Sequence, residues 1–351
     1  EDRETKITNL ATVFSMQGVG QIVSGLVLIF VTFCIEDKEI QWRLALGLGA
    51  VPMICSIYHR CIMEETDAFS ERVVDTIYDD KQPPLSNTNN YIETGNNDIE
   101  TGNNSPNQQL IARKLPVMDS IKKYKWQLVG TAGAWFLLDI VFYANGLFSG
   151  SITKSMGTSS SNRSMAVQVF ILQCMSMPGY ITSVFRMHKD GCKTIQLNGF
   201  AVITVVFAIM AALQSYLEKV GPLYIIIYGL TFFFENYGPN ATTYVIPAII
   251  YPTDSRATCH GISAACGKVG AIFGVLVLLH LKNVFCSGGE CDDDSPSGQV
   301  NHGLQLTFGF CAFIGILGWI WTYYLVDDEI HDSLKTTQRS VSMSSRSSND
   351  S

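Results

Sequence analysis

Three side chains with donor or acid groups recur at four-residue spacing inside a long apolar stretch, residues 126–152. They are Trp135, Asp139 and Tyr143, and Asp139 is the only charged residue of the stretch. In a helix this spacing places an indole N–H, a carboxyl group and a phenol on one face, over about 12 Å. Such a set can bind and release a proton and hydrogen-bond an anion. The alternative is a stray acid beside aromatic residues packed in a bundle, but a carboxylate in an apolar interior needs water, a partner or a proton.

Isolated polar residues also interrupt three other apolar stretches. Lys268 and Glu235 are each the only charged residue of a long stretch, and Asn240 directly follows Pro239 in the stretch that contains Glu235. Gln17 lies in the first stretch of the chain, where it either ties helices together or takes part in a site. Charged side chains inside a membrane are costly and are candidates for function by default. These residues therefore join the α-helical triplet as candidate site residues.

The stretches themselves predict an all-α membrane protein. A helix that crosses the hydrocarbon core of a bilayer needs about 20 apolar residues, and several uncharged runs of this length are hard to explain as buried helices of a large soluble protein. Eight such spans are expected, at residues 10–35, 42–63, 126–152, 165–185, 194–217, 223–250, 257–281 and 303–326.

Composition excludes several other classes of protein. Only 16% of the 351 residues are charged and 47% are hydrophobic, which is unlike a cytosolic enzyme. The net charge of −7, without a basic segment, argues against a nucleic-acid partner. Ten cysteines without a C-x-x-C pair predict neither a disulfide scaffold nor a zinc site. We expect no metal, no cofactor and no enzymatic activity.

The basic residues predict the orientation. If the N-terminus is cytosolic, nearly three times as many Lys and Arg residues lie in the cytosolic segments as in the outer ones. Such a bias marks the cytosolic side. We therefore expect a multi-pass membrane protein, placed in the plasma membrane, with both termini in the cytosol.

The same pattern predicts four segments. Residues 1–63 form the end of an N-terminal helix bundle with two spans, and residues 126–326 form a six-helix bundle. Residues 64–125 are polar and contain a short repeat, so we expect a disordered cytosolic loop. The Ser-rich residues 327–351 predict a disordered cytosolic tail.

The motifs around these residues resemble a known family. The run Gly130-Thr-Ala-Gly-Ala-Trp135-Phe-Leu-Leu-Asp139-Ile-Val-Phe-Tyr143 looks like the seventh helix of the phosphate:proton symporters of the major facilitator superfamily. The runs Phe233–Pro247 and Tyr251–Lys268 resemble the tenth and eleventh helices, and Val13–Gly18 and Trp42–Pro52 resemble the fifth and sixth. The resemblance implies a partial major facilitator fold, with eight of twelve transmembrane helices, the first four having no counterpart in the chain.

The resemblance also implies site residues and a substrate. In that family, inorganic phosphate is held by residues that match Gln17, Trp135, Asp139, Tyr143 and Asn240, with the lysine that matches Lys268 nearby. The chain departs from the family pattern at three positions. Ile249 stands where the family has an acid, Asp254 where it has a basic residue, and Glu235 where it has a neutral one.

Charge suggests how such a site would work. An ionised Asp139 would repel phosphate, whereas a protonated Asp139 would donate a hydrogen bond to it, so that anion and proton each raise the affinity for the other. Lys268 would compensate the charge of the anion and pair with Asp139 when the site is empty. We expect Glu235 to be either a second proton-coupling site or the partner of Lys268.

The function predicted on this basis is secondary active transport: uptake of inorganic phosphate with protons by alternating access across a lipid bilayer. Two alternatives stay open. One is a carrier of another organic or phosphorylated anion, and the other is a non-transporting phosphate sensor built on the same fold.

Overall fold

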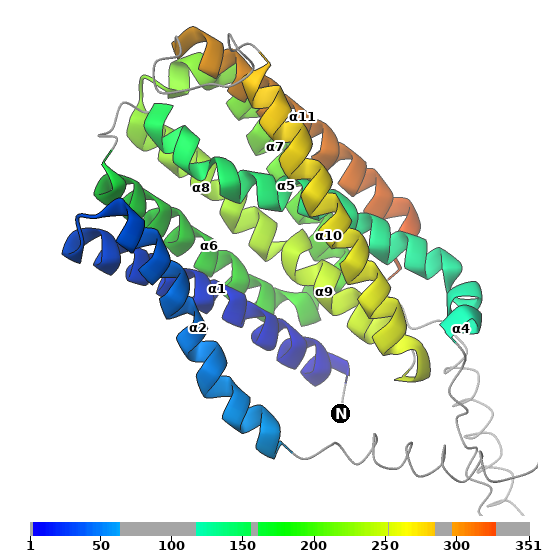
Figure 1. Ribbon diagram of the computed structural model, residues 1–351. Coiled ribbons are helices and arrows are strands. Elements are labelled where there is room, and N and C mark those ends of the chain that lie inside the picture. The colour runs from blue at the N-terminus through cyan, green and yellow to red at the C-terminus, as the bar shows by residue number, and fades with distance from the viewer. Residues whose placement is uncertain (1–2, 64–116, 156–160, 252, 285–296, 328–351) are drawn as a thin grey trace, which may run out of the picture. The chain divides into compact units, whose positions relative to one another are not determined.

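The computed structural model describes residues 3–63, 117–155, 161–251, 253–284 and 297–327, and in these ranges all regular secondary structure is helical (Figure 1). The helices are α1 Arg3–Cys34, α2 Lys38–Ile62, α4 Val117–Lys123, α5 Lys125–Ser155, α6 Asn162–Asp190, α7 Cys192–Leu217, α8 Gly221–Tyr237, α9 Pro239–Ile250, α10 Thr253–Asn283 and α11 Ser297–Leu325.

Seven of the described helices are long and apolar enough to cross a membrane, namely α1, α2, α5, α6, α7, α10 and α11. The remaining predicted span, residues 223–250, is present as two shorter helices, α8 and α9, that meet at Gly238. Pro239 explains the break, because proline lacks the backbone N–H that a continuous helix needs and disfavours helical geometry in the preceding residue.

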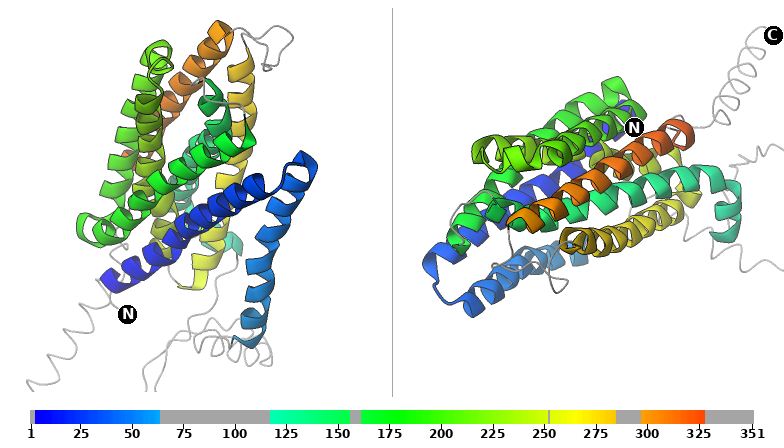
Figure 2. Two further views of the ribbon diagram at one scale, coloured as in Figure 1. Left: turned by 90° about the vertical axis from the view of Figure 1, so that its left-hand side faces the viewer. Right: turned by 90° about the horizontal axis from the view of Figure 1, so that it is seen from above.

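The chain divides into two compact units, residues 1–48 with 115–351 and residues 49–114. Within the first unit the helices pack in pairs that are distant in sequence: α1 lies along α6, α5 along α10 and α7 along α11 (Figures 1 and 2). Helices α5, α7, α8 and α11 enclose the largest buried apolar cluster, which includes Leu138, Ile140, Phe200, Phe207, Tyr224, Tyr228 and Phe308.

The pair α5–α10 is held at close range by glycine. A Cβ atom at Gly270 would collide with the carbonyl oxygen of Phe136, and one at Gly274 would collide with that of Ile140. Small residues at such positions let two helix backbones approach each other closely within a membrane. This close approach brings the face of α5 that carries Asp139 against the middle of α10.

The predicted loop at 64–125 needs correction at its end. Residues 64–116 lie outside the described ranges, but Val117–Lys123 form α4 rather than disordered chain. The helix is ordered by contacts with distant residues, which its own sequence does not predict. Ser120 Oγ and Ser255 Oγ share a hydrogen bond of 3.0 Å, and Ile121 packs against a small apolar cluster that contains Leu128. Of the predicted tail, residues 328–351 also lie outside the described ranges.

Candidate functional site

Four of the predicted residues meet between α5 and α10. The Asp139 carboxyl group is 2% exposed, and the Lys268 ammonium nitrogen lies 3.4 Å from its Oδ2 atom. The same ammonium group donates to the Tyr143 hydroxyl and lies 4.4 Å from the centroid of the Tyr143 ring. Trp135 lies one turn before Asp139 on α5, and both side chains border Gly267 of α10. The predicted face of α5 therefore exists and is completed by Lys268.

The two members of the ion pair differ in accessibility. Asp139 is buried, but the side chain of Lys268 is 58% exposed. A buried charge is stable only while it is paired or hydrogen-bonded, so Asp139 depends on Lys268 more than Lys268 depends on Asp139. An anion can thus reach the ammonium group from the open side and compete with Asp139 for it.

The position of Lys268 depends on its neighbour Gly267. A Cβ atom at Gly267 would meet the indole ring of Trp135 and would come within 2.9 Å of Asp139 Oδ2. Any larger residue there would push α10 away from the acid. Gly267 therefore lets α10 approach α5 closely, and this close approach brings the Lys268 ammonium group to the Asp139 carboxyl group.

A second group of polar side chains surrounds Asn240 at the start of α9. Its amide nitrogen lies 2.7 Å from Asn236 Oδ1, 3.1 Å from the Tyr180 hydroxyl and 3.5 Å from Gln17 Oε1. Because an amide nitrogen carries two hydrogens, it cannot satisfy all three acceptors. The longest contact, to Gln17, is the one most easily exchanged for a substrate. Four helices, α1, α6, α8 and α9, contribute to this group.

Tyr180 was missed at the sequence level. It is buried on α6, and its hydroxyl is the acceptor for Asn240, sixty residues further along the chain. Nothing in its local sequence separates it from a tyrosine of the core, because its polar contact is made by another helix.

Glu235 lies in neither of these groups. It is fully buried, and the amide nitrogen of Asn145 lies 3.2 and 3.3 Å from its two carboxylate oxygens. The same nitrogen is 2.9 Å from Thr231 Oγ1. No ion pair to Glu235 is formed by the residues that the structure describes, and Lys268 pairs with Asp139 instead. Of the two expectations for Glu235, the structure contradicts pairing with Lys268.

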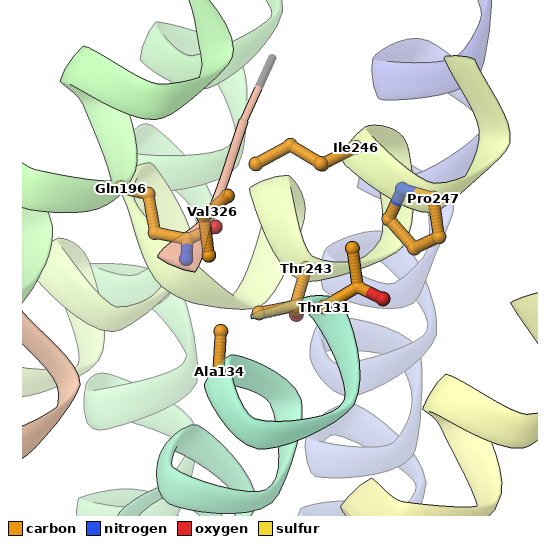
Figure 3. Close-up of a pocket in the computed structure, with 7 residues that line it drawn as sticks. All are labelled: Thr131, Ala134, Gln196, Thr243, Ile246, Pro247 and Val326. Carbon is orange, nitrogen blue, oxygen red and sulfur yellow. The ribbon is translucent and has the colours of Figure 1, made fainter. Parts of the chain in front are cut away.

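A small cavity lies away from these residues, between α5, α7, α9 and the end of α11 (Figure 3). The gaps between its side chains add up to about 140 Å³, but none is wide enough for a water molecule. Its lining consists of Thr131, Ala134, Gln196, Thr243, Ile246, Pro247 and Val326. The Gln196 amide nitrogen donates a hydrogen bond to Thr322 Oγ1 at 2.9 Å, and its amide oxygen accepts one from Thr242 Oγ1 at 2.8 Å. The cavity is therefore a packing gap beside a satisfied buried network, and none of the predicted site residues lines it.

Comparisons with known proteins agree with this architecture. Residues 9–335 match the family described as sugar (and other) transporter. The chain is 31% identical to the probable inorganic phosphate transporter 1-2 of Arabidopsis thaliana over 346 residues, which cover 90% of the chain and 65% of that relative. It is 30% identical to the low affinity inorganic phosphate transporter 1 of Petunia hybrida, covering 90% of the chain and 64% of the relative. The chain thus spans just under two thirds of the length of these curated relatives.

The family match extends from α1 through α11 and includes every residue of both polar groups. It confirms the predicted fold class, an all-α membrane protein of the major facilitator superfamily. The chain belongs to the sugar (and other) transporter family.

Proposed function

We propose that this chain is part of a secondary active transporter that takes up inorganic phosphate together with protons by alternating access. The observation that carries the proposal is the buried Asp139, flanked by Trp135 and Tyr143 and paired with an accessible Lys268. Both relatives quoted above are named as phosphate transporters, which supports the choice of substrate.

The geometry suggests how the proton is linked to the anion. Phosphate that binds at Lys268 withdraws the ammonium group from Asp139, which is too deeply buried to be stabilised by water. An ionised Asp139 would then be left uncompensated beside a second negative charge. Uptake of a proton removes this cost and turns the carboxyl group into a donor to a phosphate oxygen. Anion and proton therefore bind together, and each raises the affinity for the other.

Neutral donors complete the proposed binding site. Trp135 and Tyr143 supply an indole N–H and a hydroxyl from α5, and Asn240 and Gln17 supply amide groups from α9 and α1. Gln17 on α1 belongs to the N-terminal bundle and the other donors belong to the six-helix bundle of residues 126–326. In an alternating-access cycle, substrate sites are found near the bilayer midplane between such moving repeats. Release of the proton from Asp139 restores its pair with Lys268 and returns the empty carrier.

We propose Glu235 as a second proton-coupling group. Its carboxyl group is fully buried, and within the described residues its hydrogen bonds come from the neutral Asn145 amide, so each change in its charge is costly unless its surroundings change as well. The protonation of Glu235 can thus change with the conformational state of the bundle. The proposal includes the plasma membrane as location, with both termini and the segments 64–116 and 328–351 in the cytosol.

Uptake of radiolabelled phosphate by the full-length protein in cells that lack their own phosphate carriers tests the function. We expect saturable uptake that rises as the outside becomes more acidic. Uptake of a labelled glycerophosphodiester or organic anion in preference to phosphate would instead indicate another anion as substrate. Phosphate binding by the purified protein without any uptake would indicate a sensor.

A further inference from the structure

Four aromatic side chains from four helices form a continuous layer of rings next to the two polar groups. The centroid of Trp135 on α5 lies 5.6 Å from that of His260 on α10, and His260 lies 5.1 Å from Tyr244 on α9. Tyr244 in turn stacks on Phe14 of α1 at 4.9 Å. We call Phe14, Tyr244, His260 and Trp135 the ring layer.

Trp135 belongs to the candidate site itself, and each of the other three rings lies a short distance along its helix from a site residue. Phe14 comes three residues before Gln17, and Trp135 and His260 come four and eight residues before Asp139 and Lys268. Tyr244 comes four residues after Asn240 on α9, which runs in the opposite direction.

These offsets place the ring layer on one side of the site. At 1.5 Å per residue they correspond to about 5 to 12 Å, all toward the end of the bundle where α5 and α10 begin and α9 ends. Side-chain hydrogen bonds of Thr131 with Tyr251 and Ser263 join these three helices at that end. In the predicted orientation this end faces the cytosol, so the ring layer borders the site on its cytosolic side.

Two members of the ring layer have polar atoms without a partner. Within the described part of the chain, the ring nitrogens of His260 make no hydrogen bond with the protein, and the hydroxyl of Tyr244 makes none either. Both side chains are half-buried. Polar groups in such positions are normally satisfied by water or by a ligand.

Neither side chain is among the buried polar groups without a partner, so both donors are open to water or to a ligand. Their rings are in edge-to-face contact, which places an imidazole and a phenol side by side at the same depth. An N–H donor and an O–H donor on neighbouring rings can bind two oxygens of one oxyanion. A neutral imidazole is sufficient for this, because one of its nitrogens always carries a hydrogen.

We propose that His260 and Tyr244 form an exit subsite for the phosphate oxyanion, an inference that rests on the proposed function. The anion leaves Lys268 and Asp139, passes the ring layer as the rings part, and is held by the imidazole N–H and the phenol O–H before release. The subsite lowers the barrier to release and contributes little to the affinity of the main site, one to two helical turns away.

Variants that keep the rings and remove the donors test the proposal. His260→Phe and Tyr244→Phe preserve an aromatic side chain at each position. The full-length protein is purified and reconstituted in liposomes, and the equilibrium binding of inorganic phosphate is measured beside the rate of its net uptake. We expect phosphate affinity within twofold of wild type and net uptake reduced at least fivefold in each variant.

Matched controls lie on the same or a neighbouring helix. His280→Phe changes an exposed histidine of α10, and Tyr216→Phe changes an exposed tyrosine near the end of α7, so both should transport like wild type. If His260→Phe fails to fold, as judged by its thermal unfolding, Tyr244→Phe carries the test, because it removes a single oxygen atom that has no protein partner.

Three outcomes would overturn the proposal. Wild-type net uptake in both folded donor variants would mean that the two groups do not contact the anion on its way out. A tenfold or greater loss of phosphate affinity in both would place them in the main site. Wild-type protein that neither binds nor transports phosphate would overturn the proposed function and this inference with it, which distinguishes that failure from the first two.

Discussion

At the residue scale, the coupling of proton and anion depends on one carboxyl group, so its removal gives the most direct prediction. Asp139→Asn keeps a hydrogen-bonding side chain of the same size but cannot bind or release a proton. We expect phosphate uptake to lose its dependence on acid pH and to fall tenfold or more, which corresponds to about 1.4 kcal/mol or more in the transport cycle. The measurement is initial uptake against external pH. Asp119→Asn, at an exposed position of α4, is the matched control, and an unchanged pH profile in Asp139→Asn would refute the coupling role.

Glu235 gives a second prediction at this scale. In Glu235→Gln the side-chain oxygen can still accept from Asn145, so the local packing of α5 and α8 is kept while the titratable group is lost. If Glu235 takes part in proton coupling, the pH optimum of phosphate uptake should shift and the expression and thermal stability of the protein should stay within the range of wild type. A structural role predicts the same pH optimum as wild type in a folded, active variant.

The candidate site could be predicted in part from the sequence. Trp135, Asp139, Tyr143 and Lys268 were found because helical spacing and isolation in an apolar stretch are local signals. Asn145 and Tyr180 were missed, because their partners lie ninety and sixty residues away and their own surroundings are those of core residues. The sequence also could not predict that Lys268 pairs with Asp139 rather than with Glu235, since this depends on which face of α10 packs against α5.

At the element scale, the site depends on the close approach of α5 and α10, and this contact can be tested without touching a polar residue. Gly270→Leu would place a side chain against the backbone of Phe136 and force the two helices apart, at a cost of about 1–3 kcal/mol for overpacking. We expect a lower thermal unfolding midpoint and at least a tenfold loss of phosphate affinity, because Lys268 moves away from Asp139. Gly261→Leu on the same helix has no atom within 4 Å of the added Cβ and should behave like wild type. Equal effects of the two substitutions would contradict the role of the contact.

The helices themselves could be predicted better than their packing. Seven predicted spans correspond to continuous helices because the hydrocarbon core admits about 20 residues of apolar helix and little else. The break at Gly238 and the order in α4 depend on more than local composition. In α4 the order comes from contacts with Ser255 and Leu128, which no polar-loop signal reveals. The pairing of α1 with α6 likewise depends on contacts between distant segments, which the local sequence of either helix does not reveal.

At the scale of the whole molecule, the direction of transport depends on the orientation of the bundle, which only the distribution of basic residues predicts. Helix α7, Cys192–Leu217, offers a compact test because it crosses the membrane between two exposed lysines. Lys189 precedes it and should lie in the cytosol, and Lys219 follows it and should lie outside. Cysteines introduced by the single substitutions Lys189→Cys and Lys219→Cys are therefore expected to be accessible from opposite sides of the membrane.

The measurement is labelling by a membrane-impermeant maleimide in intact cells, with the unsubstituted chain as background for its own cysteines. Lys219→Cys should gain label in intact cells, whereas Lys189→Cys should gain label only after the membrane is permeabilised. The reverse pattern would invert the bundle and place the ring layer on the outer side of the site, which would make His260 and Tyr244 an entry rather than an exit subsite. Labelling of both positions from the same side would mean that α7 does not cross the membrane, in conflict with its length of 26 residues and its lack of charged residues after Lys193.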